Sequence, residues 1–163
     1  MADTNNHLIR TVDPRTGATQ TLALRGVEKL RPSAPLPTPV KRLREQTVAP
    51  GSGELRIQVK LPEGHTWTEG APSRATVSSS DTDVVEVPGQ GELALTEAEV
   101  LPLIFVGVGR ALLEVRLELY YCSEGEKNLC LFDETVCELP VRVEETTSES
   151  TLILSYSPSA ARP

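Results

Sequence analysis

The sequence predicts an all-β protein whose main body is an antiparallel β-sandwich of short strands. Apolar and polar residues alternate with a period of two along several segments, which is typical of strands with one buried face. The 163 residues include 13 prolines and 11 glycines, which favour frequent turns over long helices. Hydrophobic residues make up 39% of the chain, enough for one folded domain.

The clearest alternation runs from Leu55 to Leu61, where aliphatic residues alternate with charged or amide residues. Segments 113–121 and 137–143 repeat this pattern. Four further segments are strand candidates: 74–79, 84–87, 103–108 and 151–156. The third of these is apolar on both parities, which predicts a central strand buried on both faces. About seven short strands separated by turn signals indicate an antiparallel sandwich.

Composition divides the chain into four segments. Residues 1–25 predict a β-hairpin, in which a turn at 13–17 joins two strand-like stretches. Closely spaced prolines predict an extended linker over 26–52. The sandwich is expected over 53–156 and a loose tail over 157–163.

Charge is unevenly distributed along the chain. Residues 1–44 hold eight Lys/Arg and three Asp/Glu (net +5), whereas residues 45–163 hold eight and twenty (net −12). The acidic body repels phosphate backbones, so no nucleic acid is expected as a partner. No apolar run reaches the roughly 20 residues that span a bilayer, so no membrane is expected as a partner either. The first 30 residues lack the apolar centre of a signal peptide, which favours a cytoplasmic location over secretion.

Two of the three cysteines, Cys122 and Cys130, lie in the stretch LYYCSEGEKNLC. A hairpin of this length can bring their Cβ atoms within disulfide distance, and the bond would stabilise the fold by about 2–3 kcal/mol. A structural disulfide, two packed thiols and a redox-exchanging pair remain open. Exchange needs a thiolate, which is disfavoured by neighbouring carboxylates at positions 124, 126, 133 and 134, with only Lys127 opposing them.

The remaining candidates predict no catalytic centre, cofactor or metal site. Cys137 lies on the apolar parity of its segment, which indicates a core thiol. No Cys-x₂₋₄-Cys pair supports a zinc site, and no acid–base pair or nucleophile motif is present. Trp67 follows His65 in a turn-rich stretch, where it either anchors a partner or covers one end of the sandwich.

The N-terminal stretch ADTNNHLIR resembles the signature of the NHL repeat, which forms one blade of a β-propeller. The matching positions are Asp3, Asn6, His7 and Leu8. This resemblance implies that these four residues are structural. It also implies that residues 1–25 are the second half of one blade.

Segments 61–65, 68–73 and 119–122, together with Cys130, resemble the C-terminal β-domain of thioredoxin-like NHL-repeat proteins. In that family a thioredoxin-like domain precedes an NHL propeller, and the β-domain follows. The resemblance implies a fragment of a longer chain, whose partners are the missing propeller and thioredoxin-like domain. The cysteine pair is also similar to that of the immunoglobulin-like periplasmic domain of thiol:disulfide interchange reductases, which implies an immunoglobulin-like sandwich.

These resemblances imply a non-catalytic accessory or protein-interaction domain. The alternative is a redox-assisting module, in which Cys122 and Cys130 cycle between dithiol and disulfide with a thioredoxin-like partner. The chain has no Cys-x-x-Cys motif, so the activity of the thioredoxin-like domain is not expected of it.

Overall fold

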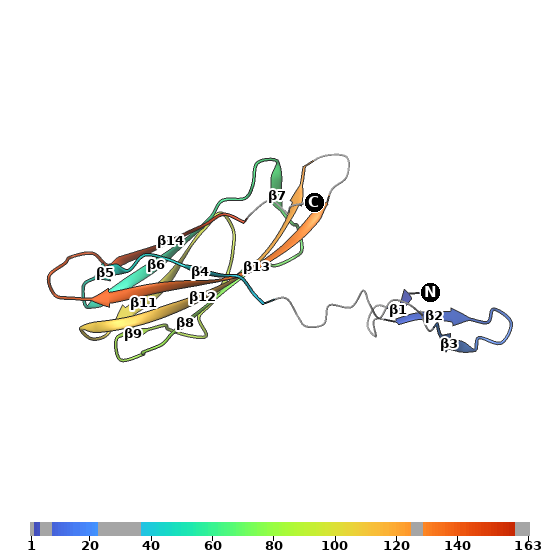
Figure 1. Cartoon of the computed structure of the whole chain (residues 1–163), viewed down its shortest axis with the longest axis horizontal. Coiled ribbons are helices and arrows are strands. Elements are labelled where there is room, and N and C mark those ends of the chain that lie inside the picture. Colours follow the sequence, from blue (N-terminus) through green and yellow to red (C-terminus); the bar gives the residue numbers. More distant parts are fainter. Residues whose placement is uncertain (1, 4–7, 23–36, 125–128, 159–163) are drawn as a thin grey trace. The chain divides into compact units, whose positions relative to one another are not determined.

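The structure, a computed structural model, describes residues 2–3, 8–22, 37–124 and 129–158 (Figure 1). These residues form strands, turns and loops and contain no helix, which confirms the all-β prediction. The chain separates into two compact units, Met1–Pro37 and Thr38–Pro163.

The first unit contains a three-stranded sheet with the order β1 (Ala2–Asp3), β2 (Leu8–Val12) and β3 (Thr19–Thr21). The turn between β2 and β3 is held by the side chain of Asp13, which accepts hydrogen bonds from the backbone N–H groups of Arg15 (2.8 Å) and Thr16 (3.3 Å). These bonds stabilise the carboxylate and lower the pKa of Asp13 below its usual value. An aspartate that bonds the backbone two residues on is a local signal for a turn.

The second unit contains two sheets. The larger has the order β10 (Glu92–Ala94), β8 (Arg74–Ser79), β12 (Gly109–Ser123), β13 (Cys130–Val143) and β4 (Val40–Arg42). Two short strands join its long members, since β5 (Gln46–Val48) pairs with β13 and β7 (His65–Trp67) pairs with β12. The smaller sheet has the order β14 (Thr151–Tyr156), β6 (Gly51–Val59), β11 (Ala98–Phe105) and β9 (Val85–Glu86).

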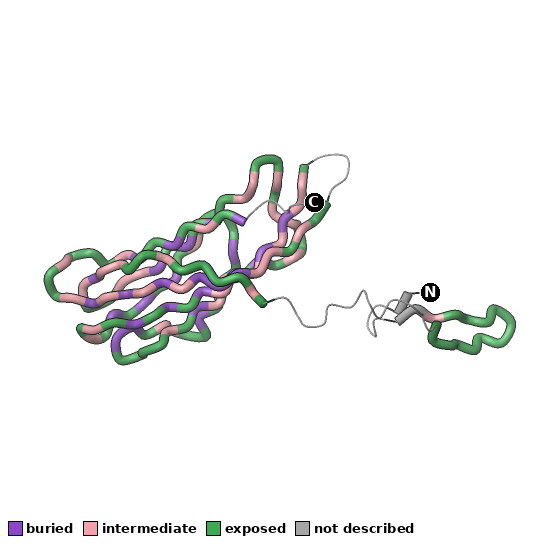
Figure 2. The backbone as a smooth tube through the Cα atoms, in the orientation of Figure 1, coloured by how far each residue is buried: buried purple, intermediate pink, exposed green. Residues whose placement is uncertain are grey.

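One hydrophobic cluster joins the inner faces of the two sheets. Leu55 and Ile57 of β6 belong to it together with Leu113 and Leu117 of β12, and all four side chains are 0% exposed. Buried residues alternate with exposed or intermediate ones along these strands, which Figure 2 draws in purple, green and pink. Removing each such leucine or isoleucine from water contributes roughly 1.5–3 kcal/mol to folding. The period-two patterns therefore identify the faces that form the core.

The prediction of a wholly antiparallel sandwich is wrong for three pairings. β4 and β5 run parallel to β13, and β14 runs parallel to β6. The first two strands lie in the segment expected to be a linker, 26–52. The prolines of this segment lie beside β4 and β5 rather than in them. A proline next to an edge strand is tolerated, because it lacks only the backbone N–H donor. Here the C=O of Pro39 still accepts a hydrogen bond from the N–H of Val136 (2.9 Å). Residues 26–36 of the expected linker and 159–163 of the expected tail lie outside the described residues.

Strand β11 also differs from its prediction. The apolar residues of segment 103–108 were expected to be buried on both faces, but Ile104, Val106 and Val108 are 40%, 52% and 62% exposed, and β11 ends at Phe105. Leu101, Leu103 and Phe105 form the buried face. The smaller sheet therefore has one face in the core and an outer face that carries exposed aliphatic side chains.

Candidate functional site: the disulfide hairpin and the cavity beside Trp67

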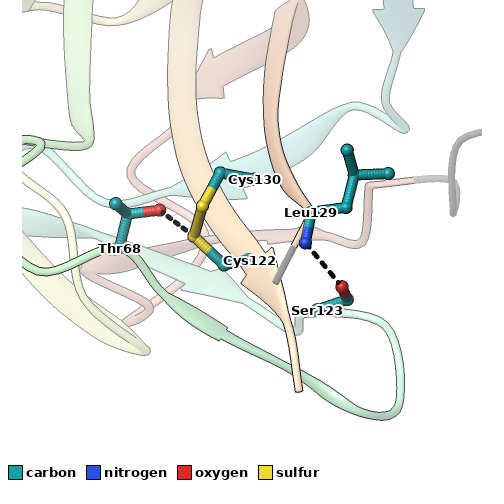
Figure 3. Close-up of a disulfide and its surroundings, with 5 residues drawn as sticks. All are labelled: Thr68, Cys122, Ser123, Leu129 and Cys130. Atoms are coloured by element: carbon teal, nitrogen blue, oxygen red, sulfur yellow. Dashed lines mark hydrogen bonds between the residues drawn. A yellow bond between two sulfur atoms is a disulfide. The ribbon is translucent and has the colours of Figure 1, made fainter. Parts of the chain in front are cut away.

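A disulfide joins Cys122 of β12 to Cys130 of β13 (Figure 3). The two residues are directly opposite each other in the antiparallel register, and their Cα atoms are 3.9 Å apart. The long hairpin of β12 and β13 thus brings the two sulfurs together at its tip. Of the three arrangements that the sequence left open, two packed thiols are excluded.

Polar contacts hold the chain on both sides of the bond. The hydroxyl of Thr68 lies 3.0 Å from Cys122 Sγ, and the backbone N–H of Thr68 donates to the C=O of Tyr120 (3.1 Å). On the other side, Ser123 donates its N–H to the C=O of Leu129 (2.9 Å), and Leu129 donates its N–H to Ser123 Oγ (3.1 Å, Figure 3). Cys130 is exposed and Cys122 is half-buried. The disulfide is therefore held in place and accessible from the side of Cys130.

The carboxylates near the cysteines in sequence are only partly their neighbours in space. Asp133 lies on the face of β13 that is turned toward the core. There its Oδ2 accepts a 2.6 Å hydrogen bond from the hydroxyl of Tyr156. Glu134 forms an ion pair with Arg116 (2.7 Å). Glu124 is exposed, while residues 126 and 127 lie outside the described part of the chain. Two of the four expected carboxylates are thus committed to other partners.

Cys137 is a free, fully buried thiol, which confirms the prediction of a core cysteine. Burial raises the pKa of this thiol, and the positive charge of Lys41 only partly offsets that effect. Burial and the hydrogen bond to Asp133 likewise raise the pKa of the Tyr156 hydroxyl. Lys41 also lies 5.2 Å from the centre of the Tyr156 ring. The raised pKa values favour the neutral thiol of Cys137 and the neutral phenol of Tyr156 between the two sheets.

Trp67 belongs to β7, where it pairs with Tyr121 at the end of β12. Its side chain is half-buried and packs against the core, and it also lines a cavity of about 550 Å³. Residues 58–61 and 97–98 supply the remaining walls together with His65 and Thr66. The His65 ring makes an edge contact with Tyr121, with centroids 5.5 Å apart. The indole therefore covers one end of the core and borders an open cavity, and a partner contact at Trp67 stays a prediction.

The other candidate residues do not join this site. Asn6 and His7 lie outside the described residues, whereas Asp3 and Leu8 pair with each other through the backbone of β1 and β2. Within the described ranges, no three His, Cys, Asp or Glu side chains gather as metal ligands would. No helix long and apolar enough to span a membrane occurs in that same part of the chain.

Sequence reasoning missed β7 and with it the cavity. The strand has only three residues, too few for a period-two pattern to be recognised. Its signal was the turn before it, where Gly64 takes a positive φ of 71°. A glycine turn followed by His-Thr-Trp, with a β-branched and an aromatic residue, is a pattern that favours a strand.

The chain is similar to several known proteins, two of which are named for NHL repeats, although no protein-family model matches it. It is 30% identical to Protein SUPPRESSOR OF QUENCHING 1, chloroplastic, of Arabidopsis thaliana, over 98% of this chain and 16% of the relative. It is 26% identical to NHL repeat-containing protein 2 of Bos taurus, over 91% of this chain and 23% of the relative. The human protein of the same name is 25% identical over 90% of this chain and 23% of its own length. The chain thus spans about a sixth to a quarter of these relatives, and the matches relate it to the NHL repeat-containing proteins.

Proposed function

We propose that this chain is the C-terminal portion of a thioredoxin-like NHL-repeat protein and acts as a non-catalytic protein-interaction domain. One observation carries the proposal: the alignments with relatives named for NHL repeats extend over at least 90% of this chain. They therefore include most of both compact units. The chain corresponds to less than a quarter of each of these relatives, so we expect the rest of a longer protein to supply its partners.

The first unit supports this proposal as part of a propeller blade. A blade contains four strands, and the described part of the first unit contains three short ones in a single sheet. A small sheet of such short strands is marginally stable by itself and leaves strand edges unpaired. The partners that would complete the unit are the neighbouring strands of an NHL propeller, and the thioredoxin-like domain would precede that propeller.

The strand order of the second unit supports an immunoglobulin-like fold for that unit. Strands β6 and β11 are neighbours, as strands B and E are, and β8, β12 and β13 follow the order of C, F and G. The five strands also occur along the chain in the order B, C, E, F, G. β14 takes the position beside β6 that strand A usually has, but it runs parallel to β6 and comes last in sequence. Immunoglobulin-like sandwiches commonly serve as interaction domains, although the fold by itself assigns no function.

The proposal is tested on the protein in its own cells. The chromosomal gene receives an affinity tag at its 3′ end, and the tagged product is purified under native conditions. Mass spectrometry then measures the length of the tagged chain and identifies the proteins that copurify. We expect either a longer chain with further NHL repeats or a separate NHL-repeat chain bound to this one. A monomeric 163-residue product without any NHL-repeat protein would contradict the proposal.

A redox-assisting module is the second candidate, and the exposure of Cys130 in the disulfide favours it. A thiolate of a dithiol partner would attack one sulfur, and the other sulfur would leave with the electron pair and take up a proton. The second thiol of the partner would then break the mixed disulfide, which leaves the partner oxidised and this pair reduced. A midpoint potential of about −270 mV for the Cys122–Cys130 couple supports exchange, whereas a value below about −300 mV supports a structural bond.

A cytoplasmic location stays a prediction from the sequence. The Arabidopsis relative is named as chloroplastic, which is a property of that protein. Because disulfides persist mainly in oxidising compartments, the redox state of Cys122 and Cys130 in cells bears on the location. Rapid thiol alkylation followed by cell fractionation measures both, and a fully oxidised pair outside the cytoplasm would contradict the prediction.

A further inference from the structure

We propose that the free edge of β7 and the cavity beside Trp67 bind an extended, positively charged segment of a partner protein. This inference rests on the proposed interaction function and deepens it, because it assigns the contact surface and the chemistry of the partner. Three features carry it: an unpaired strand edge, a cavity next to that edge and an excess of negative charge around both.

The strand edge is the first feature. β7 and β8 pair with successive parts of β12, so they lie on the same side of that strand. β10 covers the outer edge of β8 at residues 74–76, whereas no strand in the described part of the chain pairs with the outer edge of β7. An added segment would therefore occupy, beside β7, the place that β10 occupies beside β8.

The hydrogen bonds of β7 show which backbone groups face this edge. Thr68 donates its N–H to the C=O of Tyr120, and Glu124 donates its N–H to the C=O of Gly64 (2.7 Å). Successive residues of an antiparallel strand direct their backbone groups to alternate sides. The backbone groups of His65 and Trp67 therefore point away from β12. The N–H of His65 donates to the C=O of Pro62 (3.2 Å), so Trp67 is the residue of β7 that offers both its N–H and its C=O to an added strand. Such an edge is a template for strand addition by a peptide.

The cavity is the second feature. Its volume of about 550 Å³ is sufficient for a large side chain, and its apolar wall includes Val59, Leu61 and Trp67. Thr66 and Trp67 line the cavity and also belong to the strand with the free edge. A side chain of the added segment can thus enter the cavity while its backbone pairs with Trp67. An arginine suits this position, because its planar guanidinium stacks on aromatic rings.

Charge is the third feature and selects the partner. Glu97 lines the cavity, and Glu63 and Glu69 flank β7 at its two ends. The backbone N–H of Glu124 donates to the C=O of Gly64, which places Glu124 at the same end of β7 as Glu63. Among the residues that line the cavity, the charges of Glu97 and Lys60 balance each other, so the excess of negative charge comes from the three glutamates around β7. A partner segment with an arginine or lysine complements this surface, and an acidic segment is repelled.

Direct binding tests the inference, because Trp67 is the only tryptophan in the chain and reports on this site. The probe is a nine-residue peptide of alternating Thr and Val with a central Arg and capped ends. The matched control has Glu at the centre, and a third peptide carries N-methyl groups on the amides that would pair with β7. We expect the Arg peptide to change the Trp67 emission and the NMR shift of the Trp67 amide, and the other two to bind at least about fivefold more weakly.

Variants of the full chain locate the binding surface. Glu97→Lys should weaken binding of the Arg peptide about three- to fivefold, the effect of one exposed charge pair. Glu86→Lys is the matched control, since Glu86 is exposed on β9 and pairs with Ile104, at the opposite end of β11 from Ala98. It should leave binding unchanged. Trp67→Ala should abolish detectable binding, and should that variant fail to fold, the two charge variants still decide the outcome.

Several results would overturn the inference. Binding of the Glu peptide as tight as that of the Arg peptide would refute charge selection. An unchanged Trp67 signal at the solubility limit of the Arg peptide would refute the site itself. The proposed function fails separately, because it is decided by whether an NHL-repeat chain copurifies with the tagged protein. Copurification without a Trp67 response would place the contact elsewhere on this chain.

Discussion

Replacing both bridged cysteines, as Cys122→Ser/Cys130→Ser, should lower the free energy of unfolding by about 2.5 kcal/mol. The bond closes a loop between residues eight positions apart, and the chain-entropy expression for a loop of that size gives about this value at 25 °C. Little burial is lost with the sulfurs, because Cys130 is exposed and Cys122 is half-buried. The main effect is therefore greater freedom of the unfolded chain, and the midpoint of thermal unfolding should fall by about 5–10 °C.

Urea unfolding of three samples measures this effect: the oxidised wild type, the reduced wild type and the double variant. The two samples without the bond should agree within about 0.5 kcal/mol, because Cys137 is a free thiol in all of them. The slope of unfolding free energy against urea should change little. A loss below about 1 kcal/mol in both samples would refute the loop-closure reasoning. A much larger loss in the double variant alone would mean that the Ser side chains disturb the hairpin.

Three further perturbations test other parts of the fold, and the first two have matched controls. Leu117→Ala, at a fully buried position of β12, should cost about 2–5 kcal/mol in urea unfolding, whereas Leu112→Ala, at a 37% exposed position, should cost less than about 1 kcal/mol. Similar losses for the two leucines would contradict the assigned faces. Gly91→Ala should destabilise more than Gly89→Ala in the same assay. Both glycines have positive φ and share a backbone cost of about 1–2 kcal/mol, but a Cβ at Gly91 would overlap the C=O oxygen of Val77, while one at Gly89 meets nothing within 4 Å. Equal losses would show that the backbone relaxes at Gly91. The folded-state pKa of Tyr156 is raised, so its contribution to stability is present below the unfolded pKa of about 10 and is lost as pH rises from there toward the folded value. Tyr156→Phe should reduce the slope of stability against pH above pH 10, with the remaining slope in the direction expected from the raised pKa of Tyr121, and an unchanged slope would contradict this account.

The central strands could be predicted because their patterns report directly on burial. The alternation from Leu55 to Leu61 corresponds to β6, and segments 74–79 and 151–156 correspond to β8 and β14 residue for residue. In each case one face meets the core and the other meets water, so a period of two appears in the sequence. The hairpin that joins β12 and β13 made a bond between Cys122 and Cys130 possible, but the sequence could not distinguish it from two packed thiols.

The edge strands could not be predicted because their residues report on pairing rather than on burial. All three residues of β4 are exposed, and this strand is held by backbone hydrogen bonds to β13. β10 has one half-buried and two exposed residues, so its sequence shows no clear alternation. The direction of a pairing is equally hidden, because a strand buries the same face whether its neighbour is parallel or antiparallel. The cavity at Trp67 could not be predicted either, because β7, whose three residues show no pattern, forms one of its walls.

The parallel pairing of β14 with β6 bears on how the protein folds as it is synthesised. Leu152 and Leu154 fill the core beside Leu55 and Ile57, yet the ribosome makes them about a hundred residues after β6. Until they emerge, β6 has an unfilled edge that other nascent chains can occupy. A stop codon or a cleavage shortly before residue 151 should thus yield an aggregating product rather than a smaller folded domain.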